Sequence, residues 1–126
     1  MEKWLGRFSS EAYALMRLML GAAFACHGAQ KLLGAFGGTQ AATLQMQVAG
    51  VIELAGGVLI AIGLFAGYAA FLASGQMAVA YFKAHAPNGF WPIENHGELA
   101  IVYCFVFLYI ATRGSGAYSV DRLMKR

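Results

Sequence analysis

Ionisable and polar side chains that could bind a ligand or transfer protons are scattered through an otherwise apolar chain. Glu53 is the most informative, because it is the only charged residue between positions 48 and 82. A carboxylate can accept or release a proton, and imidazole and ammonium groups can donate hydrogen bonds to a ligand carbonyl. The candidates for such a ligand or proton site are His27, Lys31, Glu53, Tyr81, His85, Asn95 and Glu98.

The apolar run around Glu53 indicates a membrane protein. One unbroken helix over residues 48–82 would be ~52 Å long at ~1.5 Å per residue, whereas the hydrocarbon core of a bilayer is only ~30 Å thick. The run must therefore fold back on itself, with a turn near residues 63–68. Because 60% of the 126 residues are hydrophobic and only 12% are charged, the chain cannot cover a soluble globule with polar side chains.

The same pattern predicts an all-α fold, namely an integral membrane four-helix bundle that forms one domain over residues 1–126. The four spans are expected at about 10–33, 48–65, 68–84 and 96–112. Ser9 or Ser10 is expected to cap the first helix, and Asn95 with Glu98 to form a capping box before the fourth. The segments 34–43 and 86–95 are expected to be loops, because they are rich in Gly, Pro and Asn.

The distribution of basic residues predicts the orientation of the bundle. The terminal segments contain six basic residues, whereas the two connections at the opposite end contain two, Lys31 and Lys83. By the positive-inside rule both termini are expected in the cytoplasm, which an even number of spans allows. The N-terminal segment does not resemble a signal peptide, because its first apolar stretch is too long. Nucleic-acid binding is not indicated either, because the basic residues lie at helix ends.

Four spans would place every candidate residue at the outer end of the bundle and leave Arg17 alone near the inner end. At ~100° per residue, Arg17, His27 and Lys31 share one stripe of the first helix. Arg17 could form a structural ion pair or extend to the inner headgroups, and Lys31 could extend to the outer ones. His27 could equally be a packed, hydrogen-bonded helix residue.

Glu53 shares its helix face with Gly50 and Gly57, which would let a neighbouring helix backbone come close. Ionisable groups inside a membrane are costly and normally face the interior of the bundle. An ion pair with Lys31 or His27 is therefore the structural alternative to a ligand site at Glu53.

In the third span, Met77, Tyr81 and His85 are expected to form a stripe at four-residue spacing. His85 and His96 could instead be solvated, because they lie in the region that leads from the third helix into the fourth. Glu98 could serve only as a capping partner.

Metal, haem and thiol chemistry are further alternatives. His27, Glu53, His85 and Glu98 could ligate a metal in principle, although their spacing matches no recognised ligand motif. Cys26 and Cys104 both fall about two turns inside the outer boundary, so they could face each other and take a redox role. No CxxC is present, and small apolar side chains are the structural alternative for both cysteines.

Five blocks of sequence, in order, resemble the DoxX family of small membrane proteins. They are the segments 21–38 (GAAFACHGAQKLLGAFGG), 50–57 (GVIELAGG) with 63–64, 77–82 with His85 and 89–92, 95–100 (NHGELA) and 114–121. The resemblance implies a multi-pass, four-helix protein of a bacterial-type inner membrane. The family is named for a subunit linked to quinone-coupled thiosulfate oxidation, and members have been associated with quinone or catechol handling. The family pattern carries over His27, Lys31, Glu53, His85, Asn95 and Glu98, whereas His96 stands where the family more often has glycine.

The leading hypothesis is therefore a redox-related membrane protein that binds a quinone-like molecule in the outer half of the bundle. The chain has no cofactor motif, so a membrane or soluble partner protein would have to exchange the electrons. One alternative is an assembly subunit without catalysis, whose glycine-rich faces dock other subunits or a second copy of the chain. Another is a transporter of protons or a small molecule.

Overall fold

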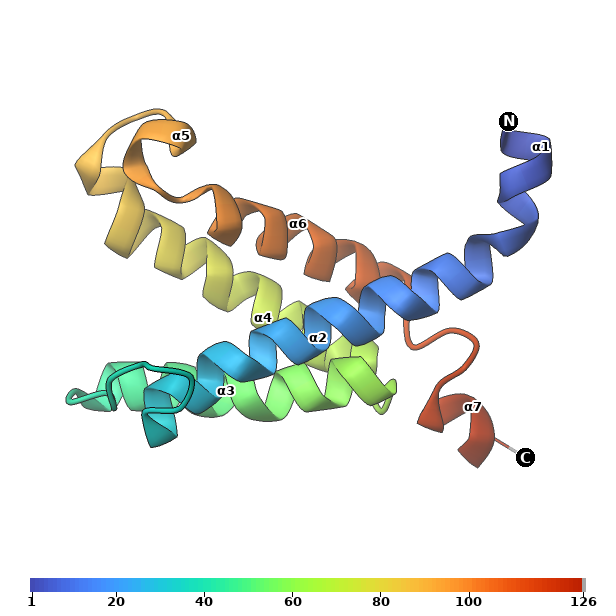
Figure 1. Ribbon diagram of the computed structural model, residues 1–126, viewed down its shortest axis with the longest axis horizontal. Coiled ribbons are helices and arrows are strands. Elements are labelled where there is room, and N and C mark those ends of the chain that lie inside the picture. The colour runs from blue at the N-terminus through green and yellow to red at the C-terminus, as the bar shows by residue number, and fades with distance from the viewer. Residues whose placement is uncertain (126) are drawn as a thin grey trace.

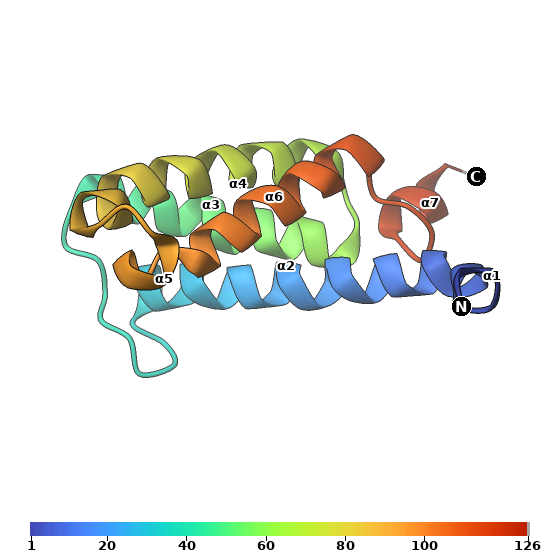
Figure 2. The same ribbon diagram turned by 90° about the horizontal axis from the view of Figure 1, so that it is seen from above.

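The computed structural model describes residues 1–125 and is helical throughout, without a strand in that part of the chain. Four long helices form the bundle: α2 (Ser9–Leu33), α3 (Leu44–Ile62), α4 (Ala66–Ala80) and α6 (Glu98–Arg113). They lie side by side, and α1 (Glu2–Leu5) and α7 (Val120–Met124) project from the same end of the bundle (Figures 1 and 2). The expected all-α bundle is thus confirmed. Arg126, one of the basic residues used to orient the chain, lies outside the described residues.

Shorter helical pieces connect or extend the long helices. The N-terminal extension comprises α1 (Glu2–Leu5) and the 3-10 turn η1 (Gly6–Phe8). After α4 the chain continues as the π-helical segment η2 (Tyr81–His85), the 3-10 turn η3 (Ala86–Asn88) and α5 (Pro92–Asn95), and the last helix, α7 (Val120–Met124), follows α6. Segment 34–43 is a loop as expected, whereas segment 86–95 contains two short helices.

Helices α2 and α3 pack backbone to backbone through glycines. A Cβ atom added at Gly57 would lie 2.5 Å from the amide nitrogen of Ala25, and one added at Gly21 would lie 2.5 Å from that of Ala61. Both distances are shorter than any ordinary non-bonded contact. The close approach that Gly50 and Gly57 predicted beside Glu53 is therefore present, and it brings Glu53 against α2.

The second pair consists of α4 and α6, and aromatic side chains join it to the first pair. Phe24 of α2 is 1% exposed, and its ring centroid lies 4.8 Å from that of Phe107 and 5.4 Å from that of Tyr103, both on α6. Figure 1 shows the α4/α6 pair diverging from α2 and α3 toward the end that carries α5. The bundle is consequently wedge-shaped, with its wide end away from the chain termini.

At the narrow end, Arg17 holds the elements together from a buried position with 2% exposure. Its guanidinium donates to the carbonyl oxygens of Ile60 and Ala61 at the end of α3, and to those of Ser115, Ala117 and Tyr118. The expectations of an ion pair and of an extension to the headgroups are both wrong. The physical reason is that the end of a helix offers unpaired carbonyls and the negative pole of its dipole.

The C-terminal segment also caps α4. The Asp121 carboxylate accepts from the amide of Phe65 (2.8 Å) and from the Ser115 hydroxyl (2.6 Å). The Ser115 hydroxyl oxygen in turn accepts from the amide of Ala66 at 3.2 Å. The α3–α4 turn is therefore fixed by residues that lie about fifty positions later in the chain.

Several helix ends differ from the expected ones. Helix α3 begins four residues before position 48, because the Thr43 hydroxyl accepts from the amide of Met46 at 3.2 Å and caps it. Neither Ser9 nor Ser10 caps α2, since the preceding residues are already helical. The Asn95–Glu98 capping box does not form, because α6 begins after Gly97 and the Asn95 side chain has other partners.

The exposed side chains of the bundle are largely apolar. Leu15, Phe71 and Phe105 on three different helices are 61%, 69% and 64% exposed. Within the described chain one helix, α3, is both long and apolar enough to cross a bilayer by itself, with a mean hydropathy of 1.6 over its best window. Such a surface requires an apolar environment or covering partners.

Candidate functional site

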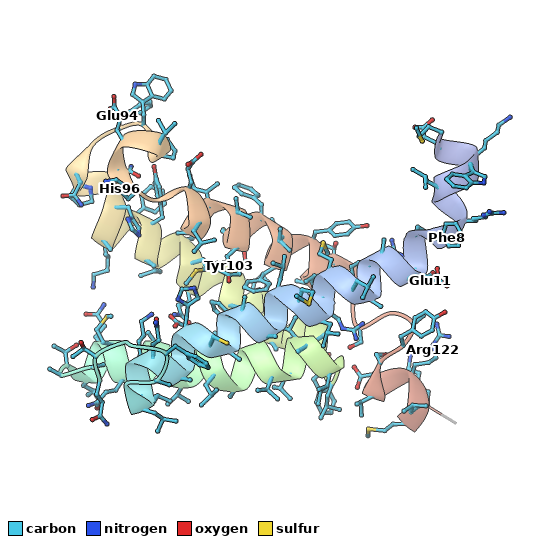
Figure 3. All side chains as sticks on the ribbon, in the orientation of Figure 1. Phe8, Glu11, Glu94, His96, Tyr103 and Arg122 are labelled. Atoms are coloured by element: carbon cyan, nitrogen blue, oxygen red, sulfur yellow. The ribbon has the colours of Figure 1, made fainter. Side chains whose placement is uncertain are left out.

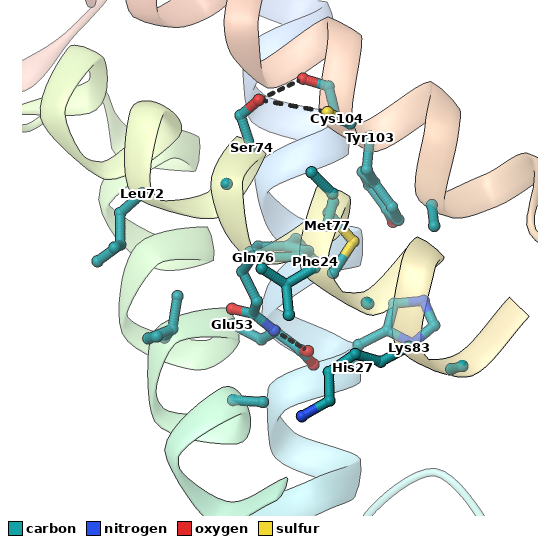
Figure 4. Close-up of a pocket in the computed structure, with 18 of the residues that line it drawn as sticks. Phe24, His27, Glu53, Leu72, Ser74, Gln76, Met77, Lys83, Tyr103 and Cys104 are labelled. Carbon is teal, nitrogen blue, oxygen red and sulfur yellow. Dashed lines mark hydrogen bonds between the residues drawn. The ribbon is translucent and has the colours of Figure 1, made fainter. Parts of the chain in front are cut away.

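A cavity of about 920 Å³ lies between the two helix pairs. Helices α2, α3, α4 and α6 and segment η2 all contribute to its walls (Figure 4). Most of the lining is apolar, and includes Phe24, Ile52, Leu72, Met77 and Leu99. Its polar and ionisable lining residues are His27, Lys31, Gln45, Glu53, Ser74, Gln76, Lys83, His85, His96, Tyr103 and Cys104.

Glu53 is the most deeply buried ionisable group in this wall, with 1% exposure. Its Oε2 atom accepts two hydrogen bonds, from Lys31 Nζ at 2.5 Å and from Gln76 Nε2 at 2.6 Å. Its Oε1 atom has no hydrogen-bond partner among the described residues. Lys31 reaches the carboxylate from α2, and its side chain is 26% exposed. The ion pair foreseen as the structural alternative therefore exists, and it occupies only one of the two carboxylate oxygens.

Aromatic groups also line the cavity. Tyr103 lies between α2 and α6 (Figure 3), and the ring centroid of His27 lies 6.1 Å from its own, at an interplanar angle of 89°. Phe24 also packs against Tyr103. A flat apolar molecule in the cavity would thus meet aromatic rings as well as the Lys31–Glu53 pair.

The structure brings together four of the seven candidates, because His27, Lys31, Glu53 and His85 all line the cavity. His96, which departs from the family pattern, lines it as well, and it is the left-handed residue (φ 62°) between α5 and α6. Figure 3 shows His96 at the wide end of the wedge.

Tyr81, Asn95 and Glu98 do not line the cavity. The buried Asn95 side chain donates to the Tyr81 hydroxyl and to the Gly89 carbonyl, each at 3.0 Å, and accepts from the Gly97 amide at 2.8 Å. These bonds make Asn95 the centre of the connection between α4 and α6. The Glu98 side chain is exposed and makes no hydrogen bond within the described part of the chain.

The expected Met77, Tyr81 and His85 stripe is interrupted. From Tyr81 onward the helix has π geometry, which adds a residue to each turn and rotates the following side chains. Met77 and His85 line the cavity. Tyr81, which lies between them in the sequence, instead accepts a hydrogen bond from Asn95.

The metal and thiol alternatives find no support in the geometry. Within residues 1–125, no three His, Cys, Asp or Glu side chains lie close enough to hold a metal ion, so the set of His27, Glu53, His85 and Glu98 is not a ligand cluster. Cys26 is exposed and Cys104 is half-buried, and both thiols are free. Cys104 lies against Ser74, with its sulfur 3.5 Å from the Ser74 hydroxyl oxygen.

Two residues that line the cavity, Gln76 and Lys83, were not among the site residues predicted from the sequence. Gln76 is a polar residue in the middle of the apolar helix α4, which is the same signal that singled out Glu53. Lys83 was used only to orient the chain, yet it lines the cavity from η2.

Taken together, the fold defines a small all-helical bundle with an apolar exterior and an ion pair facing a cavity between its two helix pairs. The sequence model of the DoxX family matches residues 12–86, which span α2, α3, α4 and η2. A protein of Haemophilus influenzae described as uncharacterized is 42% identical over 116 residues, covering 86% of this chain and 87% of that protein. A second uncharacterized protein of the same organism is 28% identical over 85 residues, covering 68% of this chain and 56% of that protein.

The chain belongs to the DoxX family, whose members are membrane-associated proteins. No solved structure matches it. His27, Lys31, Glu53, Gln76 and His85 all fall inside the segment matched by the family model.

Proposed function

We propose that the chain is a multi-pass protein of a bacterial-type inner membrane, crossing it with α2, α3, α4 together with η2, and α6. The exposed apolar side chains of the bundle and the membrane association of the family support this proposal. Both termini would face the cytoplasm, since the chain ends and most basic residues occur at the narrow end of the bundle.

This topology can be tested with reporter fusions. A reporter that is active only outside the inner membrane should work when inserted in the loop at Gly38 and fail when fused after α7. A reporter that is active only in the cytoplasm should give the opposite pattern. Equal signals at both sites would contradict four spans.

We further propose that the cavity binds a quinone-type molecule and that the protein works as a redox-related membrane subunit. The observation that carries this proposal is the buried Glu53 carboxylate, which is half satisfied by Lys31 and Gln76 and stands at the edge of an apolar cavity. The volume of about 920 Å³ is within the usual range of small-molecule sites. A quinone that is bound there would supply two-electron chemistry coupled to protons.

This chain's own residues would bind and orient such a ring. Lys31 and His27 offer donors to a carbonyl oxygen, Glu53 can hold or accept a proton, and Tyr103 and Phe24 offer ring contacts. The chain has no cofactor motif of its own. A membrane or soluble redox partner would therefore exchange electrons with the bound ring, and the bilayer would supply the ring itself.

An assembly role is the second candidate. Gly75 of α4 is exposed and also lines the cavity, and a Cβ atom added there would meet no atom within 4 Å. A partner helix, from another subunit or a second copy of this chain, could therefore approach α4 closely. Transport is not favoured, because Arg17 and the C-terminal segment fill the narrow end of the bundle.

Native mass spectrometry of the protein, extracted gently from its own membrane, tests these functions. We expect a quinone-type molecule to be retained, to be lost in Glu53→Gln, and to be kept in the matched control Glu94→Gln, which changes an exposed residue outside the cavity. A protein that carries only phospholipid would refute the ligand proposal, and a co-purifying membrane subunit would then favour assembly. The same spectra report whether the chain is a homo-oligomer.

A further inference from the structure

Residues 1–8, which comprise Met1, α1 and η1, form a short amphipathic segment at the narrow end of the bundle. The large apolar side chains of this segment recur at helical spacing, which places them on one face. This apolar face carries Met1, Trp4, Leu5 and Phe8. The opposite face carries Glu2, Lys3, Gly6 and Arg7. The segment thus presents one apolar face and one polar, partly charged face.

The apolar face of residues 1–8 is not buried against the bundle. Trp4, Leu5 and Phe8 are 60%, 48% and 46% exposed, and neither α1 nor η1 contains a buried residue. Large apolar groups that gather on one exposed face mark a contact with a partner or with a membrane. The face is therefore suited to cover by another surface.

The direction of α1 favours a membrane surface as that cover. Figure 1 shows α1 turned away from the axis of α2, and Figure 2 shows it almost end-on beside the start of α2. If α2 crosses the bilayer, as proposed above, α1 lies close to the plane of the membrane surface. Amphipathic helices in that plane bury their apolar face at the boundary between headgroups and acyl chains.

The charged groups beside the apolar face indicate which lipid it contacts. The guanidinium carbon of Arg7 lies 5.5 Å from the ring centroid of Trp4 and 4.9 Å from that of Phe8. These cation–π contacts hold the guanidinium at the border of the apolar face. Lys3 and Arg7 are both exposed, so their cationic groups can pair with the phosphates of lipid headgroups.

Helix α7 presents a second surface of the same kind at the same end of the bundle (Figure 1). Leu123 and Met124 are each 66% exposed. Two exposed basic residues flank them, Arg122 and Lys125. Over residues 1–11 and 113–125 together, basic side chains outnumber acidic ones by five to three. The narrow end therefore combines exposed apolar groups with an excess of positive charge, which is complementary to anionic lipid.

We propose that residues 1–8 form an in-plane anchor that binds the anionic phospholipid surface at the narrow end of the bundle, and that α7 extends this surface. The inference rests on the proposed function only in needing the bundle to span a membrane. Trp4 and Phe8 enter the boundary of the acyl chains, and Lys3 and Arg7 extend to the phosphates. The anchor fixes the depth of the narrow end in the bilayer.

The fluorescence of Trp4 tests this proposal directly. The chain has two tryptophans, so the full-length Trp91→Phe variant has Trp4 as its single tryptophan. This variant is placed in nanodiscs of phosphatidylcholine, into which a phospholipid with brominated acyl chains is titrated. The brominated lipid is either anionic phosphatidylglycerol or neutral phosphatidylcholine, and it quenches only a tryptophan that it touches.

We expect both brominated lipids to quench Trp4, and the anionic one to reach half-quenching at a roughly fivefold lower fraction, because each basic residue near a surface contributes about that factor in affinity for anionic lipid. The double variant Lys3→Gln with Arg7→Gln should bring the two quenching curves together. The matched control Lys3→Arg with Arg7→Lys keeps both charges and should keep the curves apart.

The outcomes separate this inference from the proposed function. If neither lipid quenches Trp4, the anchor is refuted; a blue-shifted emission would then show that a second copy or another protein covers the apolar face. If both lipids quench equally, the selection of anionic lipid is refuted. If sodium carbonate extracts the chain from its native membrane, the proposed membrane-spanning function itself fails. The comparison of the two lipids is decisive even if the charge variants do not fold.

Discussion

Two adjacent glycines of α3 should respond in opposite ways to the same substitution. At Gly57 an alanine Cβ would lie 2.5 Å from Ala25 N and 2.6 Å from the carbonyl oxygen of Gly21, both backbone atoms of α2. At Gly56 an added Cβ would meet no atom within 4 Å outside its own helix. Gly57→Ala should therefore push α2 and α3 apart, and Gly56→Ala should not.

The magnitudes follow from these contacts. Ordinary carbon contacts are about 3.5–4.0 Å, so Gly57→Ala must move the helices apart by about 1 Å. Overpacking of this kind costs about 3 kcal/mol when the opposing atoms are backbone, offset by about 1 kcal/mol of helix propensity. We expect a net loss of about 2 kcal/mol for Gly57→Ala and a gain of up to about 1 kcal/mol for Gly56→Ala.

The assay is reversible unfolding by SDS in mixed micelles, followed by far-UV circular dichroism. The difference of about 3 kcal/mol between the two variants corresponds to a factor of roughly 100 in the unfolding equilibrium. Equal stabilities for Gly56→Ala and Gly57→Ala would show that α2 and α3 do not approach through their glycines. The reasoning would then fail for the whole α2–α3 pair, including the position of Glu53 against it.

Three further changes test the ionisable residues. Arg17→Gln should lower the free energy of unfolding by about 3 kcal/mol, because it leaves buried carbonyl oxygens without a donor. It should also expose the C-terminal segment to proteolysis. Full stability in Arg17→Lys would show that the several hydrogen bonds of the guanidinium are not needed. Lys31→Met should cost about 3 kcal/mol by leaving Glu53 without its charge partner, and adding Glu53→Leu should restore most of that loss; additive losses in the double variant would refute the coupling. The hydrogen bond to Glu11 raises the pKa of Tyr118, so its stabilising contribution is present below pH ~10 and is lost as the pH rises through the higher folded-state pKa. Ultraviolet difference titration should show one tyrosine that ionises earlier in Glu11→Gln, and an unchanged titration would exclude this bond.

The sequence predicted those features that depend on one helix or on two adjacent ones. The apolar run around Glu53 predicted the fold-back between α3 and α4, and the glycines beside it predicted a close helix neighbour and the burial of the carboxylate. The convergence of His27, Lys31 and His85 on one cavity also followed, because helix periodicity and alternating direction place them at one end.

Features that depend on irregular backbone could not be predicted. The π-helical turn at Tyr81 changes the register of the following side chains, and no residue type marks its position. Asn95 is a common helix cap, yet here it binds Tyr81 and Gly89 because the connection folds back on η2. Arg17 was misjudged for a related reason, since its acceptors are carbonyls from residues 115–118, and carbonyls have no sequence signature.

The hydrogen bonds of Arg17 to α3 and to the C-terminal segment make one end of the bundle more rigid than the other. One end is pinned by a buried guanidinium and by the Asp121 and Ser115 contacts to the start of α4, while the two helix pairs spread apart toward α5. We therefore expect the separation of the α2/α3 pair from the α4/α6 pair to vary little at the end that carries Arg17 and most at the end that carries α5. In the orientation proposed above, a ligand would enter and leave the cavity through the outer leaflet. The protein would then bind only molecules present on that side of the membrane.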